Sequence, residues 1–258
     1  MNFINKIFYA CVVILIQGVF FYNQCRGQEI LKVVGYSRNS QRDNSSNPVI
    51  KAYHIKNNDG SFEKLTYRSK GICQFHETYD DSGFVMLHGI YVSYTKQGWV
   101  NEMGFYRSGQ RSGQWYRRIG VFYYAVEIYE NGKANATDSI YINPTVKNQA
   151  FISKKTNNGI VEASFPGGEM AYRKYLRDQL LQSRFVKTEE AFEPIVAFFV
   201  QATGTVTPVV VWQSHNFDVD FFARQMLQNI PRWEPAKEAI TGKNVPILYF
   251  QRMAIYQN

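Results

Sequence analysis

The sequence predicts an α+β protein of two domains, and three observations lead to this prediction. A tyrosine- and glycine-rich pattern recurs in the first half of the chain. The second half combines short β-branched runs with stretches of helical periodicity. The length of 258 residues exceeds that of a typical small domain. We therefore expect domains at 28–154 and 161–258, joined by a linker at 145–158 and preceded by a leader at 1–27.

The leader has the features of a secretory signal peptide. Lys6 precedes an apolar run from Phe8 to Tyr22 that is broken once and is shorter than the roughly 20 residues needed to span a membrane. The small residues Cys25 and Gly27 lie before a cleavage point at Gln28. We predict export to the periplasm or the outer membrane. An inner-membrane signal anchor and a lipoprotein are the alternatives.

Two short motifs repeat in the first domain. H-G-I-Y at His88 recurs 24 residues later as S-G-Q-W-Y at Ser112, and Y-R-S-G-Q at Tyr106 recurs 23 residues later as Y-E-N-G-K at Tyr129. A fixed period predicts stacked β-hairpins that turn at Ser-Gly or Asn-Gly. The pattern resembles MORN repeats, which implies a curved antiparallel sheet. The aromatic residues of the repeats are expected to pack as cross-strand pairs: Tyr91, Tyr106, Trp115 and Tyr129.

The surplus of positive charge also lies in the first half of the chain. The formal net charge is +8, whereas residues 162–258 carry ten basic and ten acidic side chains. Four arginines in or beside the predicted turns are candidates for a basic rim that binds an anionic envelope surface: Arg107, Arg111, Arg117 and Arg118. Ordinary solvated charge is the alternative interpretation. No nucleic-acid partner is predicted.

The second domain is predicted as helix, strand, strand, helix, strand. A helix follows Glu169, and Pro194–Val200 and Val206–Trp212 form a hairpin around Gly204. Apolar spacing from Val219 to Ile230 predicts a second helix, which Asp220 caps and Pro231 ends. An alternating run from Val245 to Ile255 predicts the last strand.

Several motifs of this region resemble the C-terminal domain of the TonB energy transducers. They are F-P-G-G-E at Phe165, F-V-x-x-x-G-x-V at Phe199, W-x-P at Trp233 and G-K-x-V at Gly242. The resemblance implies two helices on one face of a three-stranded antiparallel sheet, with Trp233 as a core anchor. The Tyr-Pro and Gly-Ile-x-Gly elements of that family are replaced by Arg184–Glu193.

The resemblance also implies a function without catalysis. The strand Ile247–Tyr256 is expected to bind an extended segment of an envelope protein or a receptor peptide by strand addition. Its side chains alternate between two faces, Tyr249, Gln251 and Met253 on one and Leu248, Phe250 and Arg252 on the other. A true energy transducer is the nearest alternative, although the chain has only eight prolines and no Pro-rich spacer.

No catalytic motif, cofactor site or metal site is predicted. The four histidines, His54, His76, His88 and His215, share no metal-ligand spacing. A secreted enzyme would have to use Ser214, His215 or Cys73, and neighbours such as Ser214 and His215 point to opposite sides of a strand. Cys73 is the only cysteine after the predicted cleavage point, so no disulfide is expected within the exported chain.

Overall fold

A computed structural model describes residues 28–37, 41–45, 47–69, 71–142, 159–182, 191–253 and 255–256. The predicted signal peptide at 1–27 and the predicted linker at 145–158 lie outside the described residues. In the part of the chain that is described, no helix is both long enough and apolar enough to cross a membrane.

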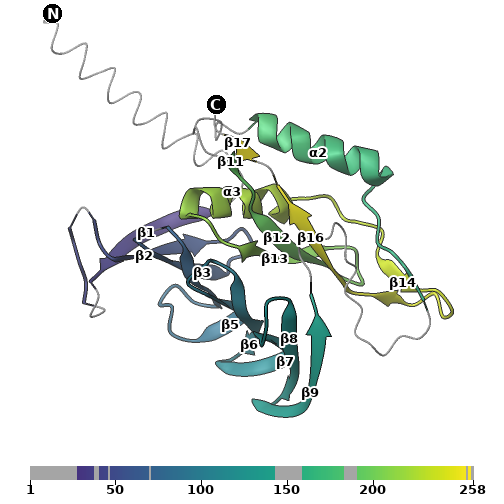
Figure 1. The fold of residues 1–258 in the computed structure, drawn as a ribbon, viewed down its shortest axis with the longest axis horizontal. Coiled ribbons are helices and arrows are strands. Elements are labelled where there is room, and N and C mark those ends of the chain that lie inside the picture. Colours follow the sequence, from purple (N-terminus) through teal and green to yellow (C-terminus); the bar gives the residue numbers. More distant parts are fainter. Residues whose placement is uncertain are drawn as a thin grey trace, which may run out of the picture.

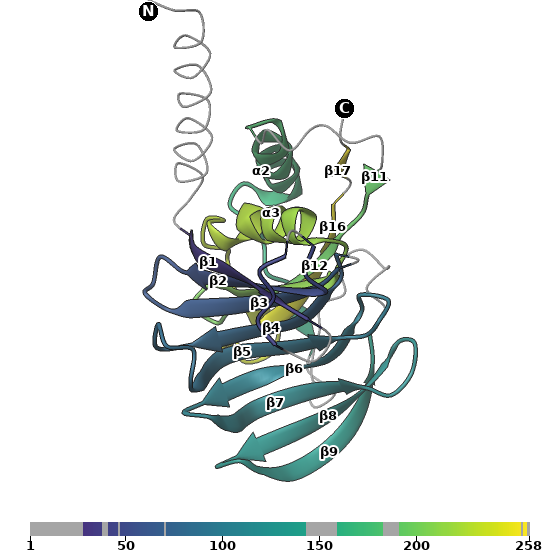
Figure 2. The same cartoon turned by 90° about the vertical axis from the view of Figure 1, so that its left-hand side faces the viewer.

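Nine antiparallel strands form the larger layer of the molecule and follow one another in chain order across the sheet. The sheet is curved, with β1 at one end and β9 at the other (Figures 1 and 2). The strands are β1 (Glu29–Tyr36), β2 (Ile50–Lys56), β3 (Phe62–Arg68), β4 (Cys73–Tyr79), β5 (Leu87–Tyr94), β6 (Val100–Arg107), β7 (Gln110–Arg118), β8 (Tyr123–Glu130) and β9 (Lys133–Tyr141).

The predicted hairpin turns are confirmed. Ser108 and Asn131 have positive φ angles of 49° and 52°, and each is followed by a glycine that also has a positive φ. Two successive residues of this kind make the turn whose twist fits a two-residue hairpin. The repeat places its aromatic rings side by side on one face, with Tyr106 and Trp115 centroids 5.1 Å apart.

The second layer is a three-stranded antiparallel sheet with two helices. Its strand order is β13-β12-β16, so β12 lies in the centre. The elements are α2 (Gly168–Gln182), β12 (Ile195–Val200), β13 (Val206–Gln213), α3 (Phe217–Gln228) and β16 (Ile247–Arg252). Two small sheets flank this layer, β10 (Ile160–Val161) with β14 (Ala236–Glu238) and β15 (Asn244–Val245), and β11 (Ala191–Phe192) with β17 (Ile255–Tyr256).

The predicted fold class is wrong. The protein is mostly β, with 53% of the described residues in strands and 13% in helices, and the nine-stranded sheet dominates the described part of the chain. The three-stranded sheet is covered on both faces rather than on one. Leu248 and Phe250 lie in a core shared with Val92 and Tyr124 of the large sheet, whereas Tyr249 packs in a second cluster on the helix side. The resemblance implied only the helices on one face, and the contact on the other face was missed because sequence patterns do not show which layers meet.

Two element boundaries also differ from the prediction. The second helix begins at Phe217, and its cap is Asn216, whose side chain accepts a hydrogen bond from the Val219 amide at 2.9 Å. Asp220 is therefore inside the helix. The predicted last strand is interrupted after Arg252, and its final part pairs with β11 instead of β12.

Trp233 is the core anchor that the sequence predicts. Its side chain is 7% exposed, and its ring contacts those of Phe165, Tyr172, Phe198 and Tyr249 at centroid distances of 5.2–5.8 Å. The aromatic cluster holds α2 and the segment before it against the helix side of the small sheet.

Candidate functional site

β16 is an edge strand of the three-stranded sheet. It pairs with β12 on one side, and no described strand pairs with its other side. Unpaired main-chain groups at a sheet edge are a template for another strand. The edge that the sequence predicts at 247–256 is therefore present, but it is limited to Ile247–Arg252.

The pairing with β12 shows which amides point outward. The amide of Met253 donates to the carbonyl oxygen of Pro194, a residue just before β12, at 3.0 Å. Because alternate residues of an antiparallel strand direct their N–H and C=O groups to opposite sides, the odd-numbered residues from Ile247 to Met253 face β12. The main-chain groups of Leu248, Phe250 and Arg252 therefore face away from the sheet.

A cavity of about 170 Å³ lies beside this edge on the helix side. Its walls include the aromatic rings of Tyr172, Trp233 and Tyr249 and the carboxylates of Glu162 and Glu169. The hydroxyl of Tyr249 donates to the carbonyl oxygen of Ala163 at 3.0 Å, which fixes the segment that forms one wall. A strand added to β16 would place side chains of one parity toward this cavity.

The structure assigns unequal roles to the six predicted partner-binding residues. The side chains of Leu248, Tyr249, Phe250 and Met253 are at most 5% exposed and serve the two cores. Arg252 is exposed and pairs with Glu193 at 3.1 Å, and Gln251 lines the cavity. The buried side chains cannot select a partner, so selectivity at this edge would depend on Gln251, Arg252 and the cavity walls.

A buried carboxylate connects the start of α3 to the large sheet. Asp220 is 1% exposed and accepts hydrogen bonds from Ser214 Oγ at 2.5 Å, from the His215 amide at 2.9 Å and from Tyr67 Oη at 3.1 Å. Burial raises the pKa of Asp220 to about 7, although these three hydrogen bonds act in the opposite direction.

A buried ion pair connects the middle of α3 to the same sheet. Arg224 Nη2 lies 2.6 Å from Glu63 Oε2, and both side chains are less than 8% exposed. His76 Nε2 lies 3.4 Å from the other oxygen of Glu63. Burial alone would raise the pKa of Glu63, but the charge of Arg224, with a smaller contribution from His76, holds it well below its usual range. The pair joins the two layers.

The residues considered for an enzyme do not form a nucleophile and base. Ser214 Oγ accepts a hydrogen bond from the Cys73 amide at 2.9 Å and donates to Asp220, whereas the His215 ring packs against Phe192. Burial raises the pKa of the Cys73 thiol well above its ordinary value, which disfavours the reactive thiolate. Among the described residues, no group of three or more His, Cys, Asp or Glu side chains is placed to hold a metal ion.

The four predicted rim arginines lie in two separate places, at the two ends of β7. Arg107 and Arg111 flank the Ser108-Gly109 turn, and Arg117 and Arg118 lie at the opposite end of the strand. Three of them have protein partners. Arg111 pairs with Glu102, Arg117 pairs with Glu127, and Arg118 donates to the carbonyl oxygens of Gly120 and Val121. They do not form one continuous basic surface.

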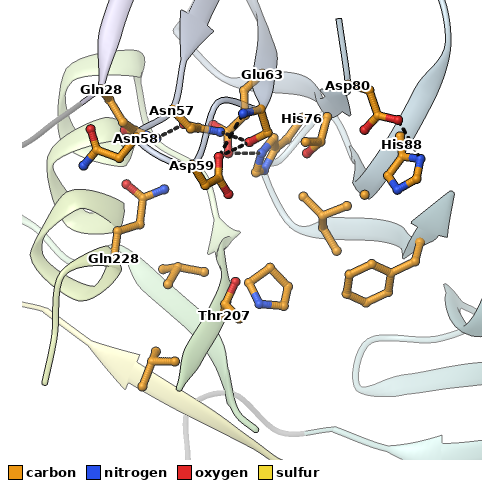
Figure 3. Close-up of a pocket in the computed structure, with 18 of the residues that line it drawn as sticks. Gln28, Asn57, Asn58, Asp59, Glu63, His76, Asp80, His88, Thr207 and Gln228 are labelled. Carbon is orange, nitrogen blue, oxygen red and sulfur yellow. Dashed lines mark hydrogen bonds and ion pairs between the residues drawn. The ribbon is translucent and has the colours of Figure 1, made fainter. Parts of the chain in front are cut away.

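Sequence reasoning missed a cleft of about 500 Å³ between the two layers. It is lined by the loop between β2 and β3, by residues of β3, β4, β5 and β6, by the first half of β13 and by the end of α3, and polar side chains project into it (Figure 3). Its residues range from Gln28 to Asn229. No spacing within one segment predicts such a site, and His76 and His88, which line it, share no metal-ligand spacing.

The chain was compared with protein-family models, with curated proteins and with solved structures, and none of the three comparisons finds a match.

Proposed function

We propose that the protein captures an extended segment of another envelope protein by strand addition along the outer edge of β16. The outward direction of the Leu248, Phe250 and Arg252 main-chain groups carries this proposal, because three consecutive outward positions offer a ladder of hydrogen bonds. The energy-transducer and enzyme alternatives stay predictions without a specific observation in their favour.

The cavity beside the edge indicates what the captured segment carries. Aromatic walls accept an apolar stem, and the carboxylates of Glu162 and Glu169 favour a positive end group. A lysine or arginine on the partner strand meets both requirements. The buried Tyr249 and Phe250 keep the edge rigid, which reduces the entropy lost on binding.

Arg252 offers the cleanest test because its side chain is exposed. Arg252→Pro removes an outward N–H, whereas the matched Arg252→Ala variant removes the same ion pair with Glu193 but keeps the amide. A photo-crosslinking amino acid at Gln251 reports the partner in envelope extracts. We expect the parent and Arg252→Ala to give a discrete cross-linked species. The yield of that species should fall about tenfold with Arg252→Pro.

The melting temperature of each variant provides the control for folding. Gln251→Pro supplies the opposite control, because its amide faces β12 and its loss should destabilise the sheet. An equal yield of the cross-linked species from folded Arg252→Pro and Arg252→Ala would contradict strand addition at this edge.

A further inference from the structure

The cleft between the layers contains buried polar atoms that have no protein partner. His76 is 1% exposed and its Nδ1 makes no hydrogen bond, and Thr78 is 9% exposed with an unpartnered Oγ1. Both residues line the cleft. A buried polar group without a partner destabilises the folded state. Such groups in the wall of a cavity indicate that something within the cavity completes their hydrogen bonds.

The remaining polar side chains narrow the chemistry of that ligand. The rim carries side-chain amides from both layers, including Asn58 from the large sheet and Gln228 opposite it at the end of α3 (Figure 3). An amide group offers donors and an acceptor together, which suits hydroxyl groups because each hydroxyl also donates and accepts. Alternating donors and acceptors across the cleft therefore fit a ligand with several hydroxyls.

Charge argues against an anionic ligand. The carboxylates of Asp59 and Asp80 line the cleft, and none of the described residues in its wall is a lysine or an arginine. His88 Nδ1 is held by Asp80 at 2.9 Å. Burial, together with the charge of Arg224, lowers the pKa of His76, so its ring is neutral near pH 7 and has one donor and one acceptor nitrogen.

The cleft also has an apolar lining. Phe105 is 37% exposed, and Ile90, Pro208 and Val209 line the same space. An aromatic ring provides a flat surface for the C–H face of a pyranose, while the amides elsewhere in the cleft bind hydroxyls. The cleft volume of about 500 Å³ lies within the range of small-molecule sites.

We propose that this cleft is a binding site for a neutral saccharide of one or two rings. His76 and Thr78 bind hydroxyls at the floor, Asn58 and Gln228 bind them from the two sides, and Phe105 covers the apolar face of the ring. The site is independent of the strand-capture edge, because the cleft is lined by β13, on the opposite side of β12 from β16.

Saccharide titrations of the full chain test the proposal. The probes are glucose, galactose, mannose, N-acetylglucosamine, maltose and cellobiose, with glucuronate as the anionic probe and spermidine as the cationic probe. Isothermal titration calorimetry and saturation-transfer NMR measure binding. We expect at least one neutral sugar to bind with a millimolar or lower Kd, and glucuronate and spermidine to bind more weakly. No binding by any neutral sugar, or tighter binding by spermidine, would overturn the proposal.

The Thr78→Val variant tests whether the sugar binds in the cleft. The substitution removes the unpartnered hydroxyl and preserves volume, so the variant should melt at or above the parent temperature. Sugar affinity should fall about three- to tenfold, the loss of one hydrogen bond. Thr66→Val on the opposite face of neighbouring β3 is the matched control and should bind like the parent. If both Thr78→Val and Phe105→Ala bind the sugar with the affinity of the parent, the sugar binds elsewhere and the proposed site is wrong.

Discussion

The two faces of the nine-stranded sheet use arginine in opposite ways. On the outer face, the Arg111 guanidinium lies 4.0 Å from the centre of the Trp115 ring, and its side chain is 30% exposed. On the inner face, Arg224 comes from α3 and binds Glu63, a residue 161 positions away, with its side chain 3% exposed. The outer contact belongs to one hairpin. The inner contact exists only when the two layers meet.

This difference teaches where the stability of the assembled fold resides. A charge in the outer contact that loses its partner is still hydrated, so the loss is small. A charge in the inner contact that loses its partner is left buried, and the cost is large. The stability of the contact between the two layers therefore depends on a few buried polar groups of α3 in addition to the shared apolar core.

Arg224→Met should have the largest effect. It leaves the carboxylate of Glu63 buried without its main partner, and we expect the free energy of unfolding to fall by about 3–5 kcal/mol in urea denaturation. The double variant Glu63→Leu with Arg224→Met should recover most of this loss, because an apolar pair replaces the ion pair. If the double variant is no more stable than the single one, the cost arises from packing rather than from charge.

Asp220→Asn should change how stability depends on pH. The folded pKa of about 7 lies above the unfolded value near 3.8, so the folded state binds the extra proton between them. The stability of the parent should therefore decrease as pH rises from about 4 to 7, and this contribution should be absent in the variant. The difference between the two unfolding curves isolates Asp220, since His76 titrates in both. A difference that is constant over this range would contradict the assignment.

Arg111→Ala should lower the free energy of unfolding by about 1–2 kcal/mol, because the guanidinium covers the Trp115 ring and also pairs with Glu102. Arg117→Ala on the same face should cost at most about 1 kcal/mol, since its side chain is 50% exposed. Thermal melts of the two variants measure both. If Arg111→Ala destabilises the protein as much as Arg224→Met does, the two faces of the sheet do not differ in the way described.

The sequence predicts what is local in this fold. Ser108-Gly109 and Asn131-Gly132 identify their hairpins because two positive φ angles in succession require such residues. Trp233 is found in the core, as the W-x-P position of the resemblance implied. Asp220 was assigned to the helix cap because Asn216, the actual cap, lies one turn earlier and is chemically equivalent in that role.

The contacts between the layers could not be predicted. Glu63 and Arg224 have no sequence signal that links them, and the alternation of β16 fits one buried face as well as two. Of the candidate sites, the position of the β16 edge strand follows from the sequence, whereas the burial of Leu248, Tyr249, Phe250 and Met253 depends on contacts with both layers. The cleft was missed because its polar residues are far apart in the sequence, from Gln28 through β3, β4, β5 and β13 to Gln228 at the end of α3.

The unbroken order of β1 to β9 has a consequence for the time course of folding. Each strand pairs with the strand made just before it, so the sheet can grow from its N-terminal end while the rest of the chain is still being synthesised. Until β12, β13 and β16 arrive, the apolar inner face of that sheet has no cover. A chain halted before β12 would therefore be a natural substrate for chaperones, and the last third of the sequence completes the protein by ending that exposure.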